Sequence, residues 1–141
     1  MIVPVMNRDG NIADNLANWL GQSFDEVILL DWSSTRPVSS LPGVLDDPRV
    51  RIVRVEDQPG FIRTVGQNIA VRMARHDRVF KCDSDVRLTG DFLAAHPLQA
   101  GEYWTGEWRQ ARDANERHLN GDIYFCRGDF ERVNGYDERI L

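Results

Sequence analysis

The sequence has 141 residues, of which 42% are hydrophobic and 28% charged, and its formal net charge is -5. This length suits one domain with a sizeable core, and the composition is ordinary for a soluble globular protein. The negative charge argues against a nucleic-acid-binding protein, because such proteins normally present a basic face. No apolar stretch approaches the ~20 residues that cross a membrane, and the N-terminus lacks a signal-peptide pattern, so we expect a cytoplasmic protein.

The first thirty residues predict a strand, a helix and a second strand. The apolar run 1–6 predicts a buried strand, although Pro4 favours an edge or a strand end because proline donates no ladder hydrogen bond. Four apolar residues then follow helical spacing before Gly21 ends the helix: Ile12, Leu16, Trp19 and Leu20. The run 27–31 predicts a second buried strand. Strand, helix and strand in this order are typical of a parallel βαβ unit.

The middle of the chain repeats this alternation. Residues 32–49 read as a loop, because serines, prolines and a glycine break any period. Residues 51–55 predict a third strand, less hydrophobic and so nearer an edge, and residues 62–73 predict a second amphipathic helix. A buried strand then leads into Asp83. The pattern predicts an α/β fold with a mostly parallel central sheet flanked by helices.

The end of the chain alternates less regularly. We expect a short helix around residues 91–93, a strand followed by an aromatic loop in 101–109, a strand at 123–126 and a short helix at 129–133. Asn134 and Gly135 would close this last helix.

Two carboxylates, Asp83 and Asp85, follow the buried strand one residue apart. If the chain stays extended there, side chains at i and i+2 point to the same side. Two carboxylates in one place repel each other, and Mg²⁺ or Mn²⁺ held between them and substrate phosphates relieves this. The carboxyl end of a strand is also where open α/β sheets bind their ligands. We therefore predict a metal–diphosphate site with Asp83 and Asp85 as metal ligands.

Five segments, taken in order, resemble glycosyltransferases of family 2, which have the A-type fold that binds nucleotide-diphospho-sugars. They are residues 3–8, 28–34, 67–70, 83–85 and 128–138, the last being similar to the start of the C-terminal region of galactosyltransferases. The sequence departs from the family at two positions. Trp32 stands where the family often has a second acid, and Gln67 stands where it usually has an arginine.

The resemblance implies a Rossmann-like A-type fold in which residues 1–141 form one nucleotide-sugar-binding domain, incomplete at its C-terminus. Asp31 would accept the uracil N–H, Asp83 would lie near the ribose, and Asp85 would hold the metal. Arg63, one helical turn before Gln67, would replace the missing phosphate contact. The nucleotide-sugar-binding residues implied are Pro4, Asn7, Arg8, Asp31, Asn68, Asp83, Ser84 and Asp85.

The expected function is that of a hexosyltransferase-like glycosyltransferase that uses Mn²⁺ or Mg²⁺. It would move a sugar from a UDP-sugar donor to a carbohydrate or lipid-linked acceptor whose identity the sequence does not give. Peripheral association with a membrane is compatible with such an acceptor. The family's base, which deprotonates the acceptor hydroxyl, is expected beyond Leu141, so no catalytic residue is assigned. Apolar surface left by that missing segment would favour a homodimer without requiring one.

Two alternatives stay open. One is a nucleotide-sugar-binding fragment or pseudoenzyme without turnover, which the early C-terminus favours. The other is a nucleotidyltransferase, which usually carries a glycine-rich, basic loop after its first strand to grip a triphosphate. Residues 6–10 offer only one arginine and one glycine there, so this alternative is weaker.

Overall fold

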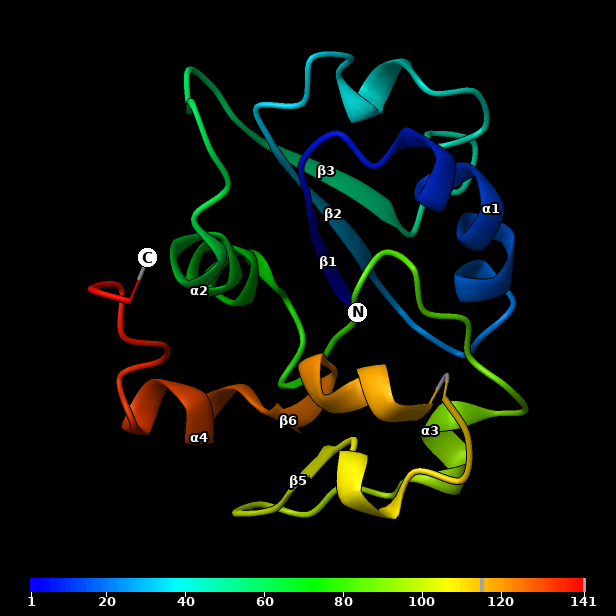
Figure 1. Cartoon of the computed structure of the whole chain (residues 1–141), viewed down its shortest axis with the longest axis vertical. Coiled ribbons are helices and arrows are strands. Elements are labelled where there is room, and N and C mark those ends of the chain that lie inside the picture. The colour runs from blue at the N-terminus through cyan, green and yellow to red at the C-terminus, as the bar shows by residue number, and fades with distance from the viewer. Residues whose placement is uncertain (115, 141) are drawn as a thin grey trace.

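The chain forms a sheet with helices on both faces, as Figure 1 shows. The computed structural model describes residues 1–114 and 116–140. In this part of the chain the strands are β1 (Ile2–Val5), β2 (Val27–Trp32), β3 (Val50–Val55), β4 (Arg78–Lys81), β5 (Tyr103–Thr105) and β6 (Ile123–Cys126). They lie in the order β3-β2-β1-β4-β6-β5. The pairs from β3 to β4 are parallel and those involving β6 are antiparallel, so the predicted mostly parallel α/β fold is confirmed.

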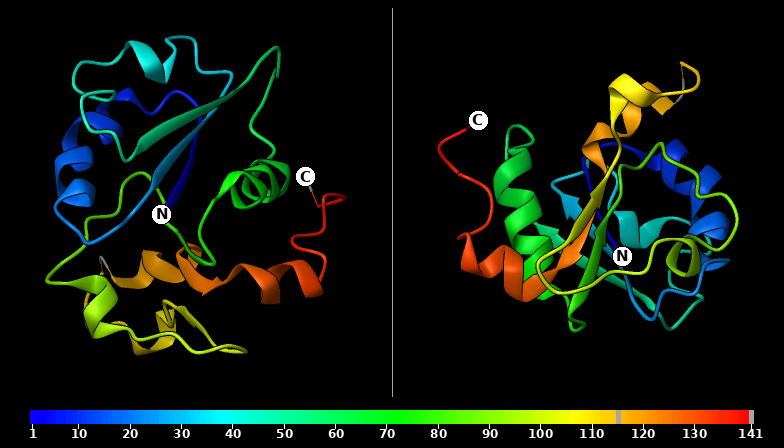
Figure 2. Two further views of the ribbon diagram at one scale, coloured as in Figure 1. Left: turned by 180° about the vertical axis from the view of Figure 1, so that it is seen from behind. Right: turned by 90° about the horizontal axis from the view of Figure 1, so that it is seen from below.

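Helices cover both faces of the sheet, and two views in Figure 2 separate them. The α-helices are α1 (Asp9–Leu20), α2 (Arg63–Met73), α3 (Phe92–Ala95) and α4 (Arg127–Arg132). The 3₁₀ helices within the described residues are η1 (Val38–Ser40), η2 (Trp108–Gln110) and η3 (Glu116–Gly121). Helices α1 and α3 lie on one face and α2 and α4 on the other. Among the described residues, no helix is long and apolar enough to cross a membrane.

The core has two layers, because alternate side chains of the central strands face opposite sides of the sheet. Val3 and Val5 of β1 pack with the apolar face of α1, whereas Ile2 packs with that of α2. All six residues of β2 are buried. Burial on both faces is the reason that these strands read as continuous apolar runs rather than as an alternating pattern.

The position of β1 differs from one expectation. Pro4 favours an edge strand or a strand end, and the first of these does not apply because β1 lies in the middle of the sheet. The reason is that β1 pairs with β4 only at Ile2–Lys81, so no β4 ladder needs a donor at Pro4. Pro4 therefore lies near a strand end, as proline prefers. The edge position predicted for the third strand is confirmed, since β3 pairs with β2 alone.

The end of β4 also differs from the expectation. This strand ends at Lys81, and the chain turns at Ser84 and Asp85 instead of remaining extended. The two-residue repeat therefore holds only as far as Asp83, whose carboxylate lies beside the ammonium of Lys81. Asp83 and Asp85 come together through a turn, in which the amide of Val86 donates to the carbonyl of Asp83 at 3.2 Å.

Candidate functional site

A pocket of about 320 Å³ opens where β1 and β4 end. Chain order runs from β1 to β2 and β3 on one side and continues with β4 on the other, so the pocket lies at the switch point of the parallel strands. Such points bind ligands in open α/β sheets. Six of the predicted nucleotide-sugar-binding residues line it: Pro4, Asn7, Arg8, Asp83, Ser84 and Asp85. Arg63, predicted as a phosphate contact, and Gln67 line it from α2.

Helix α1 holds the turn that carries the carboxylates. Asn15, which is buried in the helix, donates to the carbonyl of Ser84 at 2.8 Å. One turn further on, the indole of Trp19 donates to the carbonyl of Val86 at 2.9 Å. These two bonds fix the backbone on either side of Asp85. The amphipathic pattern of the helix predicted its buried face, and this face carries polar groups that support the site.

The two carboxylates of the pocket lie in different surroundings. Asp83 forms an ion pair with the ammonium of Lys81, whose side chain is only 3% exposed. Lys81 also donates to the carbonyl of Gly121 at 2.7 Å. Asp85 is exposed, and no hydrogen bond or ion pair of its carboxylate occurs within the described ranges. The pocket therefore contains one paired and one unpaired carboxylate.

Asp122, a third carboxylate, lies directly before β6 and supports Asp83, a role that was not predicted from the sequence. Its Oδ1 accepts a 2.7 Å hydrogen bond from the amide of Asp83, and its Oδ2 is buried and finds no hydrogen-bond partner within residues 1–114 and 116–140. Burial raises the pKa of Asp122 to about 7; the Asp83 amide opposes this rise, and the charge of Asp83 adds to it. No motif marks Asp122 in the sequence, because its role depends on the antiparallel pairing of β4 with β6.

The residues of the pocket fit a divalent cation whose coordination shell is completed by oxygens of a bound phosphate ligand. Asp83 and Asp85 line the pocket, Asp122 lies behind Asp83, and hard carboxylate oxygens are what Mg²⁺ and Mn²⁺ prefer. No group of three His, Cys, Asp or Glu side chains in 1–114 and 116–140 lies close enough to hold a metal by itself. Phosphate oxygens of a ligand would therefore have to supply part of the coordination shell.

Asp31 lies outside this pocket. It is fully buried and accepts hydrogen bonds from the amides of Ser34 and Val38, both at 3.0 Å, and from the guanidinium of Arg54. The hydroxyl of Ser34 in turn accepts from the amide of Asn7, which lines the pocket. These contacts favour a role in which Asp31 holds the loop beside Asn7. The predicted uracil contact stays a prediction.

Asn68 also lies outside the pocket. From α2 it donates to the carbonyl of Tyr136 at 3.0 Å and to the carboxylate of Glu138 at 2.9 Å, and it accepts from the amide of Tyr136 at 3.0 Å. Gly135 sits tightly against it, with φ of +68°. The segment after α4, in red beside α2 in Figure 1, is thereby fastened to α2. Nucleotide-sugar binding by Asn68 likewise stays a prediction.

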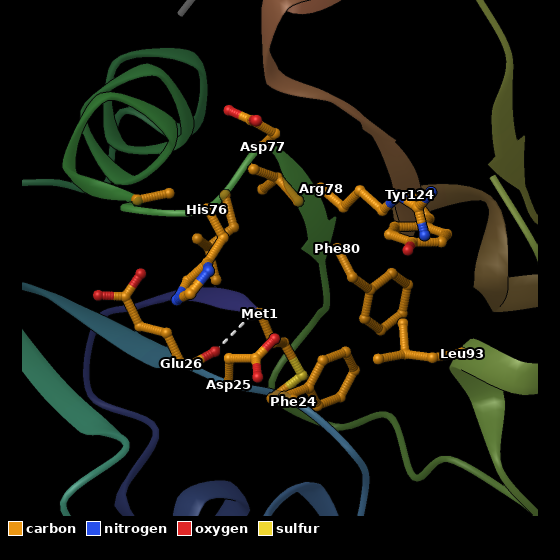
Figure 3. Close-up of a pocket in the computed structure, with 13 residues that line it drawn as sticks. Met1, Phe24, Asp25, Glu26, His76, Asp77, Arg78, Phe80, Leu93 and Tyr124 are labelled. Carbon is orange, nitrogen blue, oxygen red and sulfur yellow. Dashed lines mark hydrogen bonds between the residues drawn. The ribbon is translucent and has the colours of Figure 1, made fainter. Parts of the chain in front are cut away.

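A second cavity, of about 370 Å³, opens at the opposite edge, where β1 and β4 begin. Figure 3 shows the rings of Phe24 and Phe80 on its apolar side and Glu26 and His76 on its polar side. The carboxylate of Glu26 is already paired with Arg51. This edge is not the one at which open parallel sheets bind ligands, so we take the pocket at the ends of β1 and β4 as the candidate site.

Comparisons with protein-family models and with curated proteins gave no match. Solved structures do match. The mannosyltransferase PcManGT from Pyrobaculum calidifontis, in complex with GDP-Man and Mn²⁺, is 19% identical to this chain, with a TM-score of 0.70. The match covers 97% of this chain and 46% of the PcManGT chain. S. aureus TarS 1–349, alone or in complex with UDP, is 17% identical to this chain, with a TM-score of 0.70. The match covers 99% of this chain and 50% of the TarS 1–349 chain.

These likenesses establish the fold. The chain has the A-type glycosyltransferase fold that the resemblance implied, and it spans about half the length of the solved structures that it matches. Identity this low carries no further property of those proteins over to this chain.

Proposed function

We propose that the chain binds a UDP-sugar in the pocket at the ends of β1 and β4, as the donor-binding part of a metal-dependent glycosyltransferase. One observation carries the proposal: acidic and basic side chains meet in this one pocket, at the switch point of the sheet. The shared fold supports the ligand class, since PcManGT was solved with GDP-Man and Mn²⁺ and TarS with UDP.

The basic side chains suit a diphosphate. Arg8 follows β1 and Arg63 opens α2, so the two guanidinium groups reach the pocket from different elements. A guanidinium presents paired N–H donors that match phosphate oxygens. The first backbone N–H groups of α2 have no partner within the helix and also favour an anion. In this arrangement Arg63 makes the phosphate contact of the arginine that the family usually has where this chain has Gln67.

The acidic side chains suit a divalent cation bound together with the phosphates. Asp83 and Asp85, the two predicted ligands, line the same pocket. When bound, the cation would supply Lewis-acid stabilisation of the charge on the leaving diphosphate. The chain's own contribution is to hold the backbone that carries these carboxylates, through the hydrogen bonds from Asn15 of α1 and to Asp122.

Calorimetric titration with UDP, with Mn²⁺ and with a chelator, tests the proposal. UDP should bind at least about tenfold more tightly with Mn²⁺, because the cation offsets the repulsion between phosphates and carboxylates. Asp85→Asn should remove this gain. Asp14→Asn, which neutralises an exposed carboxylate on α1 outside the pocket, is the matched control and should keep it.

Three results would count against the proposal. Absence of UDP binding in both buffers would overturn it. Equal affinity in both buffers would overturn the metal dependence. Tighter binding of GDP would refute the choice of uridine, and tighter binding of UTP would favour the nucleotidyltransferase alternative.

A further inference from the structure

Asp83 is held at three points, whereas Asp85 has no partner in the part of the chain that the structure describes. The ammonium of Lys81 pairs with Oδ1 of Asp83. The amide of Asp83 donates to Asp122 at 2.7 Å. A Cβ atom on Gly121 would lie 2.3 Å from Oδ2 of Asp83, so the carboxylate fits only because residue 121 has no side chain. The two carboxylates of the pocket are therefore not equivalent.

Lys81 is the only lysine in the sequence, and it is buried. A buried ammonium is costly unless it is paired, so Lys81 must keep both of its acceptors, Asp83 and the carbonyl of Gly121. Its place in the sheet is fixed by backbone pairing with Ile2 of β1 and Ile123 of β6. The positive charge is thus built into the floor of the site and does not depend on a flexible side chain at the surface.

A positive charge so close to Asp83 competes with any other cation for that carboxylate. A divalent ion that used Asp83 would have to displace the ammonium or lie beside it, and both cost electrostatic energy. Asp85 carries no such cost. Phosphate oxygens bring negative charge into the pocket and would offset the repulsion between the ammonium and the ion.

We infer that Lys81, with Gly121 and Asp122, is a positioning residue that keeps Asp83 out of the coordination shell of the divalent cation, so that of the two predicted metal ligands only Asp85 binds the ion. The inference deepens the proposed function and rests on it. Cation binding by the chain without nucleotide is accordingly weak and depends on Asp85, and the cation enters together with the diphosphate.

Mn²⁺ titration without nucleotide, followed by electron paramagnetic resonance of the free ion, tests this inference. Lys81→Met removes the ammonium and keeps the apolar stem. Because Asp83 is then released, Mn²⁺ should bind at least about tenfold more tightly than to the unchanged chain. A purely structural role of Lys81 would give no gain in affinity.

Two further variants separate the pairing from the general charge of the pocket. Arg63→Met removes one positive charge from the same pocket but breaks no contact of Asp83, and should raise Mn²⁺ affinity less than about threefold. Adding Asp83→Asn to Lys81→Met should return the affinity to its starting value. An unchanged affinity in Lys81→Met, an equal gain in Arg63→Met, or a gain that survives Asp83→Asn would each overturn the inference.

The measurement stays decisive if Lys81→Met does not fold. Lys81→Gln also removes the charge but keeps an N–H donor for the carbonyl of Gly121, and it carries the same expectation. Thermal unfolding identifies the folded variant. Because no nucleotide is present, failure of UDP binding would overturn the proposed function without affecting this result, and an unchanged Mn²⁺ affinity would overturn only the inference.

Discussion

The amide of Asp83 donates a 2.7 Å hydrogen bond to Oδ1 of Asp122, a residue 39 positions later in the chain. This bond joins the turn after β4 to the start of β6. The other oxygen of Asp122 is buried and has no hydrogen-bond partner among the residues that the structure describes. Asp122 thus supports the site at a cost to the stability of the fold.

Asp122→Asn should stabilise the chain at pH 8 in the presence of a chelator. Asparagine keeps the acceptor for Asp83 and removes a buried charge, a gain of about 1–3 kcal/mol in the free energy of unfolding. Burial raises the folded-state pKa of Asp122 to about 7, so its ionisation penalty is absent below pH ~4 and grows as the pH rises from there to 7. Thermal melts at pH 4 and pH 8 should therefore separate the two proteins only at pH 8. A lower melting temperature of the variant at pH 8 would contradict this account.

Asp31→Asn should destabilise the chain at neutral pH. Burial acts to raise the pKa of Asp31, but hydrogen bonds from Val38, Ser34 and Arg54 outweigh it and lower the pKa below its ordinary value. The charged form therefore contributes stability above pH ~4, and this contribution is lost as the pH falls through the lowered pKa. Losing charged hydrogen bonds costs about 1.5–3 kcal/mol each. Urea unfolding at pH 7 and pH 2.5 should show a larger deficit at pH 7 than at pH 2.5.

The same variant tests the predicted uracil contact. If Asp31 acts only by holding the loop beside Asn7, the variant should lose affinity for UDP and for pyrophosphate by similar factors. A loss confined to UDP would instead support direct base recognition. Calorimetry with both ligands, on the variant and on the unchanged chain, decides between the two.

Gly121→Ala should weaken UDP binding without changing any charge. The added methyl group would displace the carboxylate of Asp83 from its seat between Lys81 and Gly121. Loss of one charged hydrogen bond corresponds to a tenfold to hundredfold lower affinity, about 1.5–3 kcal/mol. Gly128→Ala in α4 is the matched control, because nothing lies within 4 Å of its added Cβ. Equal affinities of the two variants would show that the space at residue 121 does not matter.

Asn68→Ala should loosen the segment after α4 while the sheet stays intact. It removes the hydrogen bonds to the amide and carbonyl of Tyr136 and to Glu138. Losing these partly buried hydrogen bonds costs about 0.5–1.5 kcal/mol each. Hydrogen exchange of the Tyr136 amide should accelerate, whereas exchange in β2 should not. Unchanged protection at Tyr136 would mean that other contacts hold the segment.

Much of the fold was predictable because apolar periodicity depends only on local sequence. The alternation of strands and helices, the short helices near the end and the edge position of β3 all follow from it. The central place of β1 did not follow, since the expectation for Pro4 assumes a full ladder on both sides. How far β1 and β4 overlap is a property of the whole sheet and cannot be read from one strand.

The same distinction, between local sequence and long-range pairing, separates the site residues that were predicted from those that were not. Residues of the predicted set that follow β1 and β4 meet in one pocket, because the carboxyl ends of parallel strands share one edge. The roles of Lys81 and Asp122 in holding Asp83 were missed, since they arise from the antiparallel return of β6 beside β4. The lone lysine, two residues before Asp83, was the signal in the sequence that could have pointed to the role of Lys81. The bonds of Asp31 to Ser34 and Val38 depend on a loop whose path has no periodic pattern.

Because Lys81 is buried, covalent modification of its amino group can be used to measure access to the site. With no other lysine in the chain, every reagent that acylates lysine side chains must reach the floor of the pocket. Acylation of the ε-amino group in intact protein would therefore report how often the ammonium leaves Asp83 and becomes accessible through the pocket. A nucleotide seated over the ammonium should slow this labelling, and mass spectrometry of a single peptide would follow it.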